Sequence, residues 1–293
     1  MPPANQSTAK GVLYVAVAEL LIAVSAALIK LLSQSSVPLE LAIFYRNFFG
    51  LLILSVFVGG HGLQILKTRV IHLHVSRACL GLMAMYCFFY ALKHIPLAMA
   101  MTLFMTTPFF IPIVAAFWLK ESVKASTLVI ILLGFAGVVL IMDPRGDFSP
   151  IMLVAVAGGL LAAVVKVNLR KMGATEHPVT IVFYFALLST LISLLPALPR
   201  WQIPSLREYT LLLAIGFAAS GGQLLLSRGF SYAPASVIGP IGFVSILYSA
   251  LFGWIFWNET LNQYFLLGAC LIIAAGVLLV YFSKKPEIVK PEI

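Results

Sequence analysis

The sequence predicts an all-α polytopic membrane protein, with ten transmembrane helices that form two inverted repeats of five helices each. Three observations support this fold class. Hydrophobic residues make up 61% of the 293 residues and charged residues only 10%, which leaves too little polar surface to cover a soluble globule. Ten apolar stretches have the length of about 20 residues that crosses a hydrocarbon core of about 30 Å. Finally, a segment of the first half recurs in outline in the second half.

The ten predicted spans are joined by links of only a few residues, so we expect no soluble domain between them. Glu19 lies in the middle of the first span and no small-residue cleavage pattern follows it, which argues against a removable signal peptide. The predicted spans are residues 12–32, 39–59, 71–92, 97–119, 124–142, 150–168, 179–198, 208–229, 235–257 and 264–282.

The repeat is clearest in one segment, because His94–Glu121 matches Tyr232–Glu259 in outline 138 positions later. Similar features occur in the same order outside this segment, which chance similarity between two apolar helices does not produce. Since each repeat holds an odd number of spans, the second repeat enters the bilayer from the opposite side. The repeats are predicted at residues 1–143 and 144–293.

Basic residues set the predicted orientation. With the N-terminus inside, thirteen of the nineteen Lys and Arg lie in or near cytoplasmic segments, as the positive-inside rule requires. Both termini are therefore predicted to be cytoplasmic. This bias and the attraction to anionic membrane lipids account for the net charge of +9, so the charge gives no reason to expect nucleic-acid binding.

Ionisable residues at membrane depth are candidate functional residues, because they need water, a partner or the protein interior around them. Glu19 and Lys30 lie on one stripe of the first span, about 16 Å apart at a rise of 1.5 Å per residue, so they cannot pair with each other. Glu19 suits proton coupling or amine binding, or it stays neutral and hydrogen-bonds to backbone. Lys30 either snorkels to the surface or takes a gating role.

Arg46 lies about two turns into the second span, with no acidic residue at helical spacing further into the span. Its guanidinium either braces a loop by binding backbone carbonyls, the interpretation that we favour, or holds a carboxylate or phosphate of the substrate.

Glu121 and Glu259 follow spans four and nine. Each either caps the helix that comes next, or the two latch alternating gates at opposite faces of the membrane.

The lining of a midplane site is expected from spans that combine small residues with polar or aromatic ones. Spans four and nine contain Pro108 and Pro240, helix breakers that free backbone groups near mid-membrane. For each individual Met or aromatic residue, ordinary core packing remains the alternative. The predicted substrate-binding residues are Glu19, Tyr86, Tyr90, Thr102, Thr106, Gln223, Ser245 and Tyr248.

These features resemble the EamA domain of the drug/metabolite transporter superfamily. The resemblance rests on Lys30, Glu40, Arg46, the basic residue Arg77 that opens span three, and the motifs that end in Glu121 and Glu259. In the second half the pattern departs, since Leu169, Phe185 and Ile246 replace the equivalents of Lys30, Arg46 and Pro108. Membership would imply a ten-span secondary transporter, often an exporter of amino acids and other metabolites, in a bacterial inner membrane.

The expected function is therefore secondary transport of small metabolites by alternating access, most simply export of amino acids or related compounds. Alternatives are an uptake carrier for a cofactor-like solute, resembling riboflavin or S-adenosylmethionine, and a non-transporting scaffold. The sequence has no G-x-x-x-x-G-K, H-E-x-x-H or G-x-S-x-G motif, so ATP-driven pumping and enzymatic hydrolysis are not expected. No cofactor or metal is expected. Protons as coupling ions and a homodimer are left open.

Overall fold

The computed structural model describes residues 8–59, 66–118, 120, 123, 125–142, 148–172, 176, 178–232 and 239–282. Every element in this part of the chain is helical, as predicted. Eight helices are long and apolar enough to cross a membrane, and Ile241–Trp257 forms a shorter apolar helix. The 21 residues of α2 have a comparable length. The prediction of an all-helical, polytopic membrane protein is confirmed.

The helices follow the predicted spans closely. Spans four and nine are each divided into two pieces, and a short 3-10 helix follows span seven. In chain order the elements are α1 (Thr8–Leu32), α2 (Leu39–Gly59), α3 (Ile71–His94), α4 (Leu97–Phe104), α5 (Thr107–Trp118), α6 (Ala125–Met142), α7 (Pro150–Met172), α8 (Pro178–Ala197), η2 (Leu198–Arg200), α9 (Leu206–Tyr232), η3 (Gly239–Phe243), α11 (Val244–Trp257) and α12 (Gln263–Phe282).

The division of span four follows from Pro108, which has no N–H and whose ring would clash with the carbonyl four residues earlier. That carbonyl belongs to Phe104, the last residue of α4, and it accepts a hydrogen bond of 2.8 Å from the Thr107 hydroxyl. The Thr106 hydroxyl likewise donates to Leu103 O at 2.7 Å. Threonine side chains thus satisfy backbone groups at the break, as the absence of water in a membrane demands.

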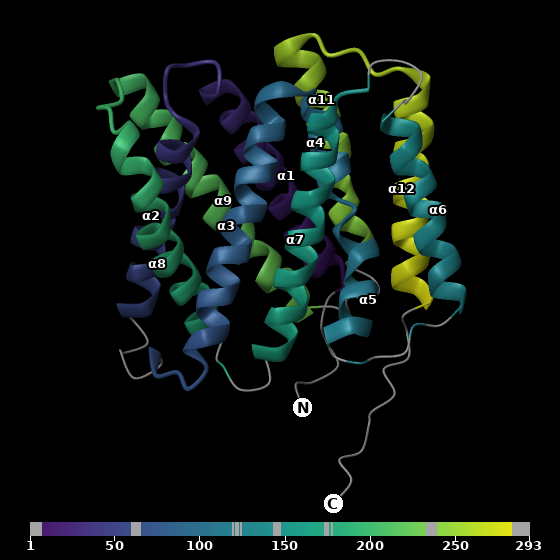
Figure 1. Cartoon of the computed structure of the whole chain (residues 1–293), viewed down its shortest axis with the longest axis horizontal. Helices are drawn as coiled ribbons and strands as arrows, with labels where there is room; N and C mark the ends of the chain where they lie inside the picture. The colour runs from purple at the N-terminus through teal and green to yellow at the C-terminus, as the bar shows by residue number, and fades with distance from the viewer. Residues whose placement is uncertain are drawn as a thin grey trace, which may run out of the picture.

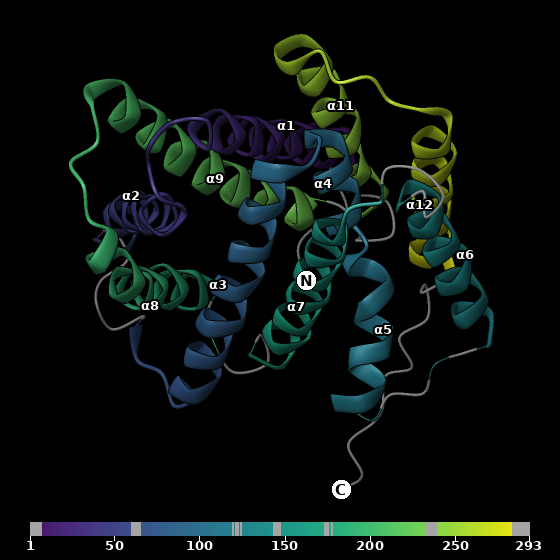
Figure 2. The same cartoon turned by 45° about the horizontal axis from the view of Figure 1, so that its top comes forward.

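The helices pack in pairs that relate the two halves of the chain (Figures 1 and 2). The most extensive contacts join α1 with α9, α3 with α7, α2 with α8, and α6 with α12. Gly137 of α6 and Gly268 of α12 meet backbone to backbone, so that a Cβ at Gly137 would lie 2.7 Å from Gly268 O. Such small residues let helix backbones approach closely where no hydrophobic effect drives association.

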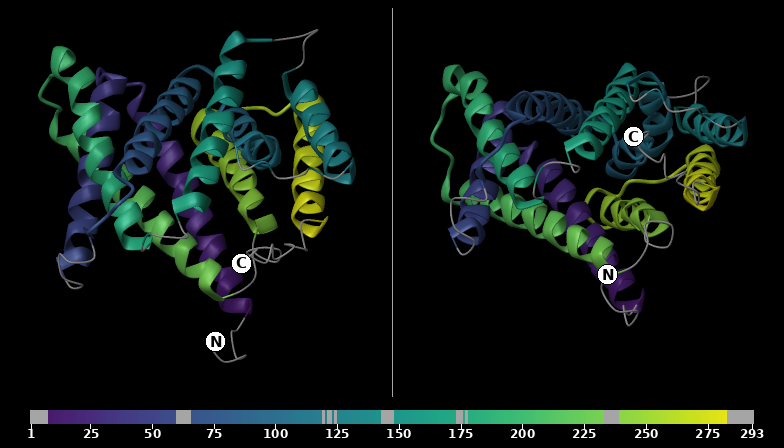
Figure 3. Two further views of the ribbon diagram at one scale, coloured as in Figure 1. Left: turned by 60° about the horizontal axis from the view of Figure 1, so that its bottom comes forward. Right: turned by 90° about the horizontal axis from the view of Figure 1, so that it is seen from below.

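The direction of the helices can be followed in Figure 1. The first helix, α1, begins and α12 ends at the lower end of the bundle, whereas α7 begins at the upper end and runs downward. Seen from below, α6 and α12 form one flank of the molecule, away from the long α1 and α9 pair (Figure 3). We call the end where α1 begins the terminal end and the opposite end the distal end.

Candidate functional site

Glu19 lies in the interior of the bundle, next to the divided span nine. Its side chain is 5% exposed. The Oε1 atom lies against Gly242 of η3, 3.5 Å from where a Cβ would be, and the carboxyl is within hydrogen-bonding range of the Ser245 side chain. The Oε2 atom has no hydrogen-bond partner among the described residues. One carboxyl oxygen is therefore buried without a partner, which leaves it able to carry a proton.

Ser245 shapes what Glu19 can do. Its hydroxyl is fully buried and donates to Gly242 O at 2.7 Å. A hydroxyl has a single proton to donate, so the Ser245 oxygen is left as an acceptor. A protonated Glu19 could donate to this oxygen, whereas the hydroxyl would have to turn away from Gly242 O to donate to an ionised Glu19.

Lys166 of α7 interacts electrostatically with Glu19, and sequence reasoning missed this interaction. Lys166 is one of the thirteen Lys and Arg that the predicted orientation counts as cytoplasmic. Its side chain is exposed. The available signal was its position inside the apolar stretch 150–168, two residues before its end.

A second cluster, which we call the latch, joins both halves of the chain at the distal end. Lys30 Nζ lies 2.6 Å from Glu259 Oε1 and donates to Ile95 O at 2.9 Å. Glu259 accepts from the N–H of Leu97, the first residue of α4, at 2.8 Å to Oε2. The side chains of Lys30 and Glu259 are only 12% and 10% exposed. Lys30 therefore pairs with an acid rather than snorkelling.

Glu259 caps a different helix from the expected one. The prediction that it caps the next helix in sequence is wrong, since Asn262 Oδ1 accepts the Phe265 N–H at the start of α12, at 2.7 Å. The turn after α11 aims Glu259 back toward α4, because Asn258 adopts a left-handed conformation with φ 51°. Lys120, 138 positions earlier, has a φ of 56°, so the two halves share this turn.

Arg46 is partly buried on α2 and lacks the backbone partners that a bracing role requires. Its Nη1 donates to Asn47 Oδ1 at 3.1 Å and lies 3.3 Å from Met85 Sδ. No carboxylate in the described ranges lies within ion-pairing distance of it. The bracing interpretation is therefore wrong for the contacts that the structure describes. Arg77 does brace the fold, since its Nη1 donates to Ile181 O at 2.6 Å.

The other predicted binding residues do not converge on Glu19. Thr102 and Thr106 are fully buried, and each hydroxyl donates to a carbonyl of its own segment at 2.7 Å. The Tyr86 hydroxyl is buried without a partner and lies in the field of Glu40. The ring of Tyr90 packs at a tilt against His94, with centroids 4.3 Å apart.

Of the remaining predicted residues, Gln223 is exposed on α9 and Tyr248 is partly buried on α11. Pro108 lies at the start of α5, at the break described above. The side chain of Pro240 and the whole of Glu121 lie outside the described residues. Within the described ranges, no group of three His, Cys, Asp or Glu side chains could hold a metal ion.

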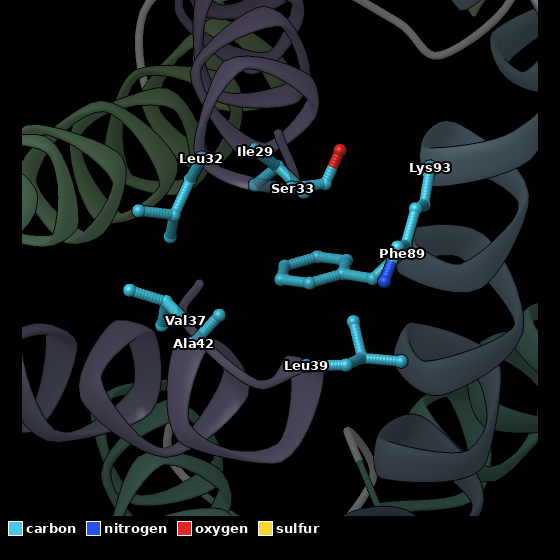
Figure 4. A pocket seen from close by; sticks show the side chains of 8 residues that line it. All are labelled: Ile29, Leu32, Ser33, Val37, Leu39, Ala42, Phe89 and Lys93. Atoms are coloured by element: carbon cyan, nitrogen blue, oxygen red, sulfur yellow. The ribbon is translucent and has the colours of Figure 1, made fainter. Parts of the chain in front are cut away.

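A small pocket opens at the distal end between α1, α2 and α3 (Figure 4). Ile29 and Leu32 of α1, Ala42 of α2 and Phe89 of α3 form its apolar wall, and Lys93 lies at its side. Ala42 lies one helical turn from Arg46 on α2, and Phe89 lies one helical turn from Met85 on α3. The contact between Arg46 and Met85 is therefore the next layer below the pocket.

The terminal end is held by different contacts. Leu169, at the position equivalent to Lys30, packs against the buried Leu73, Met172 and Ile181. Next to this apolar cluster, His74 Nε2 lies 3.2 Å from Glu176 Oε2. This end therefore combines apolar packing with one His-Glu contact.

Comparison with known proteins places these features in one family. Residues 9–143 and 149–282 each match the EamA-like transporter family. The pseudopaline exporter CntI of Pseudomonas aeruginosa strain UCBPP-PA14 is 31% identical over 272 residues, which cover 92% of this chain and 95% of the exporter. The S-adenosylmethionine uptake transporter of Rickettsia bellii is 30% identical over 83% of this chain and 84% of its own.

Two further comparisons agree. The riboflavin transporter of Vibrio cholerae is 28% identical over 76% of both chains. One solved crystal structure shares 20% identity with a TM-score of 0.65, covering 94% of this chain and 99% of its own, which supports the fold alone. Relatives of this chain thus include both an exporter and uptake transporters.

Proposed function

This chain belongs to the EamA-like transporter family, and from that premise we propose that it is a secondary transporter that works by alternating access. It is a multi-pass membrane protein of a family that carries small molecules. We propose export of amino acids or related compounds, in line with the pseudopaline exporter. The S-adenosylmethionine and riboflavin transporters favour uptake of a cofactor-like solute as the second candidate. A scaffold role is not retained, and we expect no enzymatic activity.

The proposed architecture is ten spans in two inverted repeats, residues 1–143 and 144–293. The packing supports this architecture. In the repeat, α7 is the equivalent of α1 and α9 is the equivalent of α3, so the contact of α1 with α9 has the contact of α7 with α3 as its counterpart. The opposite directions of α1 and α7 agree with inversion, as do the matching turns at Lys120 and Asn258. We propose an inner-membrane location with both termini cytoplasmic, which makes the distal end the outer one. A homodimer is left open.

The single observation that supports the transport site is Glu19, a buried carboxyl whose Oε1 lies against the divided span nine and whose Oε2 has no hydrogen-bond partner among the described residues. We propose that Glu19 alternates between a protonated state bound to Ser245 and an ionised state that attracts Lys166 or a substrate amine. Exchange of that proton would couple solute movement to the proton gradient. Tyr86, Tyr90, Gln223 and Tyr248 are proposed to line the path of the solute. Thr102 and Thr106 would act by satisfying the broken backbone beside it.

The latch supplies the gate in this proposal. Lys30 and Glu259 belong to different repeats, so a rocking motion of one repeat against the other would pull them apart. Each charge would then be hydrated, which removes the penalty of leaving it unpaired. The gate at the terminal end would involve Glu121, the repeat partner of Glu259.

The test is counterflow of a pooled, labelled metabolite library into proteoliposomes that contain the full chain. Wild type should accumulate a defined solute, and its uptake should depend on an imposed pH gradient. Glu19→Gln cannot release a proton, so it should keep counterflow and lose the pH dependence. Glu208→Gln, in an exposed cap at the start of α9, is the matched control and should behave like wild type.

Two results would contradict the proposal. If wild type moved no solute under any gradient, the transport function itself would be rejected. If Glu19→Gln retained the full pH dependence of wild type, transport would stand and the proton role of Glu19 would be rejected.

A further inference from the structure

Two neighbouring side chains on α2 present hydrogen-bond donors that have no acceptor. The Nε and Nη2 groups of Arg46 make no hydrogen bond with any described residue, and Nη1 reaches only the amide oxygen of Asn47 and the sulfur of Met85, a weak acceptor. Asn47 is 4% exposed, and its Nδ2 is buried without a partner. The guanidinium of Arg46 and the side-chain amide of Asn47 thus both have N–H groups without an acceptor.

Two acids of the distal end have partners of their own. Glu40, six residues before Arg46 on the same helix, accepts from Arg200 at 2.8 Å, although its other carboxyl oxygen is buried without a partner. Glu259 is held by Lys30 and Leu97. Buried polar groups are normally paired, so the buried, unpartnered Nδ2 of Asn47 requires an explanation.

Arg77 shows what a structural arginine looks like in the same protein. It is 8% exposed, donates to Ile181 O at 2.6 Å, and lies over the Phe185 ring, 4.5 Å from the centroid. Phe185 occupies the repeat position of Arg46. The Arg77 guanidinium is therefore held by a backbone carbonyl and an aromatic ring, although its Nε is buried without a partner, whereas Arg46 has no carbonyl partner among the described residues.

A ligand that binds to these N–H groups must supply hydrogen-bond acceptors and needs no donor of its own. A carboxylate meets this condition, because its two oxygens match the fork of an arginine side chain. The pocket in Figure 4 lies above this site on the side of the distal end, since its Ala42 and Phe89 walls lie one turn above Arg46 and Met85. Lys93 at the side of this pocket adds a second positive charge at the distal end.

We infer that Arg46 and Asn47 form a binding site for the carboxylate of the transported solute, below the pocket between α1, α2 and α3. The inference rests on the proposed transport function and narrows it, because it selects carboxylate-bearing solutes such as amino acids or S-adenosylmethionine. Riboflavin, which carries no carboxylate, would not satisfy this site.

The first test needs no solute. Asn47→Asp replaces the amide with an isosteric carboxylate next to Arg46, so it places an internal anion in the site. Thermal unfolding of the purified full chain in detergent should show a higher melting temperature than wild type, because the guanidinium gains a charge-assisted bond. This gain should disappear in the Arg46→Gln background.

Asn168→Asp is the matched control. Asn168 is also fully buried, but its Nδ2 already donates to Leu73 O and Ser76 Oγ. A carboxylate there cannot donate to Leu73 O and would bond Ser76 only if the hydroxyl turned away from its own acceptor, so the melting temperature should fall. If Asn47→Asp lowered the melting temperature like Asn168→Asp, or failed to fold, the carboxylate site would be rejected.

The second test uses the solutes. In proteoliposomes, counterflow of labelled L-amino acids and S-adenosylmethionine is competed with each unlabelled acid or its carboxamide. Wild type should prefer acids over amides by about tenfold or more, the value of a hydrogen-bonded charge. Arg46→Gln should abolish this preference, and Arg77→Gln should keep it. Equal inhibition by acids and amides in wild type would overturn the inference while leaving transport itself intact.

Discussion

The two ends of the bundle are closed in different ways at equivalent positions. At the distal end, Lys30 pairs with Glu259 from the other half, and Glu259 also binds the first N–H of α4. At the terminal end, Leu169 takes the position of Lys30 and packs into an apolar cluster with Leu73, Met172 and Ile181. Related backbones therefore carry an ionic closure at one end and apolar packing at the other.

The difference matters for how each end opens. An ion pair with 12% and 10% exposed side chains is penalised severely if one partner is removed, but both charges are well solvated once water enters. Exposing apolar surface costs about 25 cal/mol of free energy for each Å². This cost does not depend on the direction of the contacts. We expect the distal end to open as a discrete switch and the terminal end to open in proportion to the area exposed.

The largest effect is expected from Glu259→Gln. This change removes the charge that pairs with Lys30 and weakens the cap on Leu97, so a partly buried lysine is left without its acid. The free energy of unfolding in detergent should fall by about 3–5 kcal/mol, as when one partner of a buried pair is lost. Glu208→Gln, in the exposed cap with Ser205, should lose only about 1 kcal/mol. Equal losses would show that the latch is no stronger than a surface cap.

Lys30→Met should have an intermediate effect. Glu259 keeps its hydrogen bonds from the Leu97 N–H, so the ion pair and the hydrogen bond from Lys30 to Ile95 O are lost, and we expect about 1–3 kcal/mol in the same unfolding measurement. Exchanging the charges, with Lys30→Glu and Glu259→Lys together, should not restore wild-type stability. A lysine at 259 cannot accept the Leu97 N–H, and full restoration would contradict the role of the cap.

The smallest effect is expected from Leu169→Ala. The side chain is only partly buried, so truncation should reduce the free energy of unfolding by about 1–2 kcal/mol. Because no charge is involved, the loss should be the same at low and high salt. A loss that changes with salt would mean that the neighbouring contact between His74 and Glu176, rather than apolar packing, holds this end.

Sequence reasoning located the helices because their causes are local. A continuous apolar stretch must form a helix in a membrane, where each backbone group needs a partner within the segment. The division of span four was also predictable, since Pro108 removes a donor and excludes a neighbouring carbonyl. The same reasoning marked Glu19, Lys30 and Glu259, because charges at these depths need an explanation.

Partners could not be assigned in this way. Glu259 was expected to cap the nearest helix, yet it caps α4, 162 residues away in sequence. Lys166 looked like an orientation signal, yet it also interacts electrostatically with Glu19. Arg46 was expected to brace a loop, and the structure describes no carbonyl that it binds. In each case the residue was noticed and its contact was missed.

The sequence by itself determined that the chain lies in a membrane, roughly where its helices begin and end, and which charges lie within the spans, because these follow from hydrophobicity and the backbone's need for hydrogen bonds. Only the tertiary structure decided which charge meets which, because pairing depends on how helices from the two halves cross. The latch, the Glu19 site and the unfilled donors on α2 all arise at such crossings.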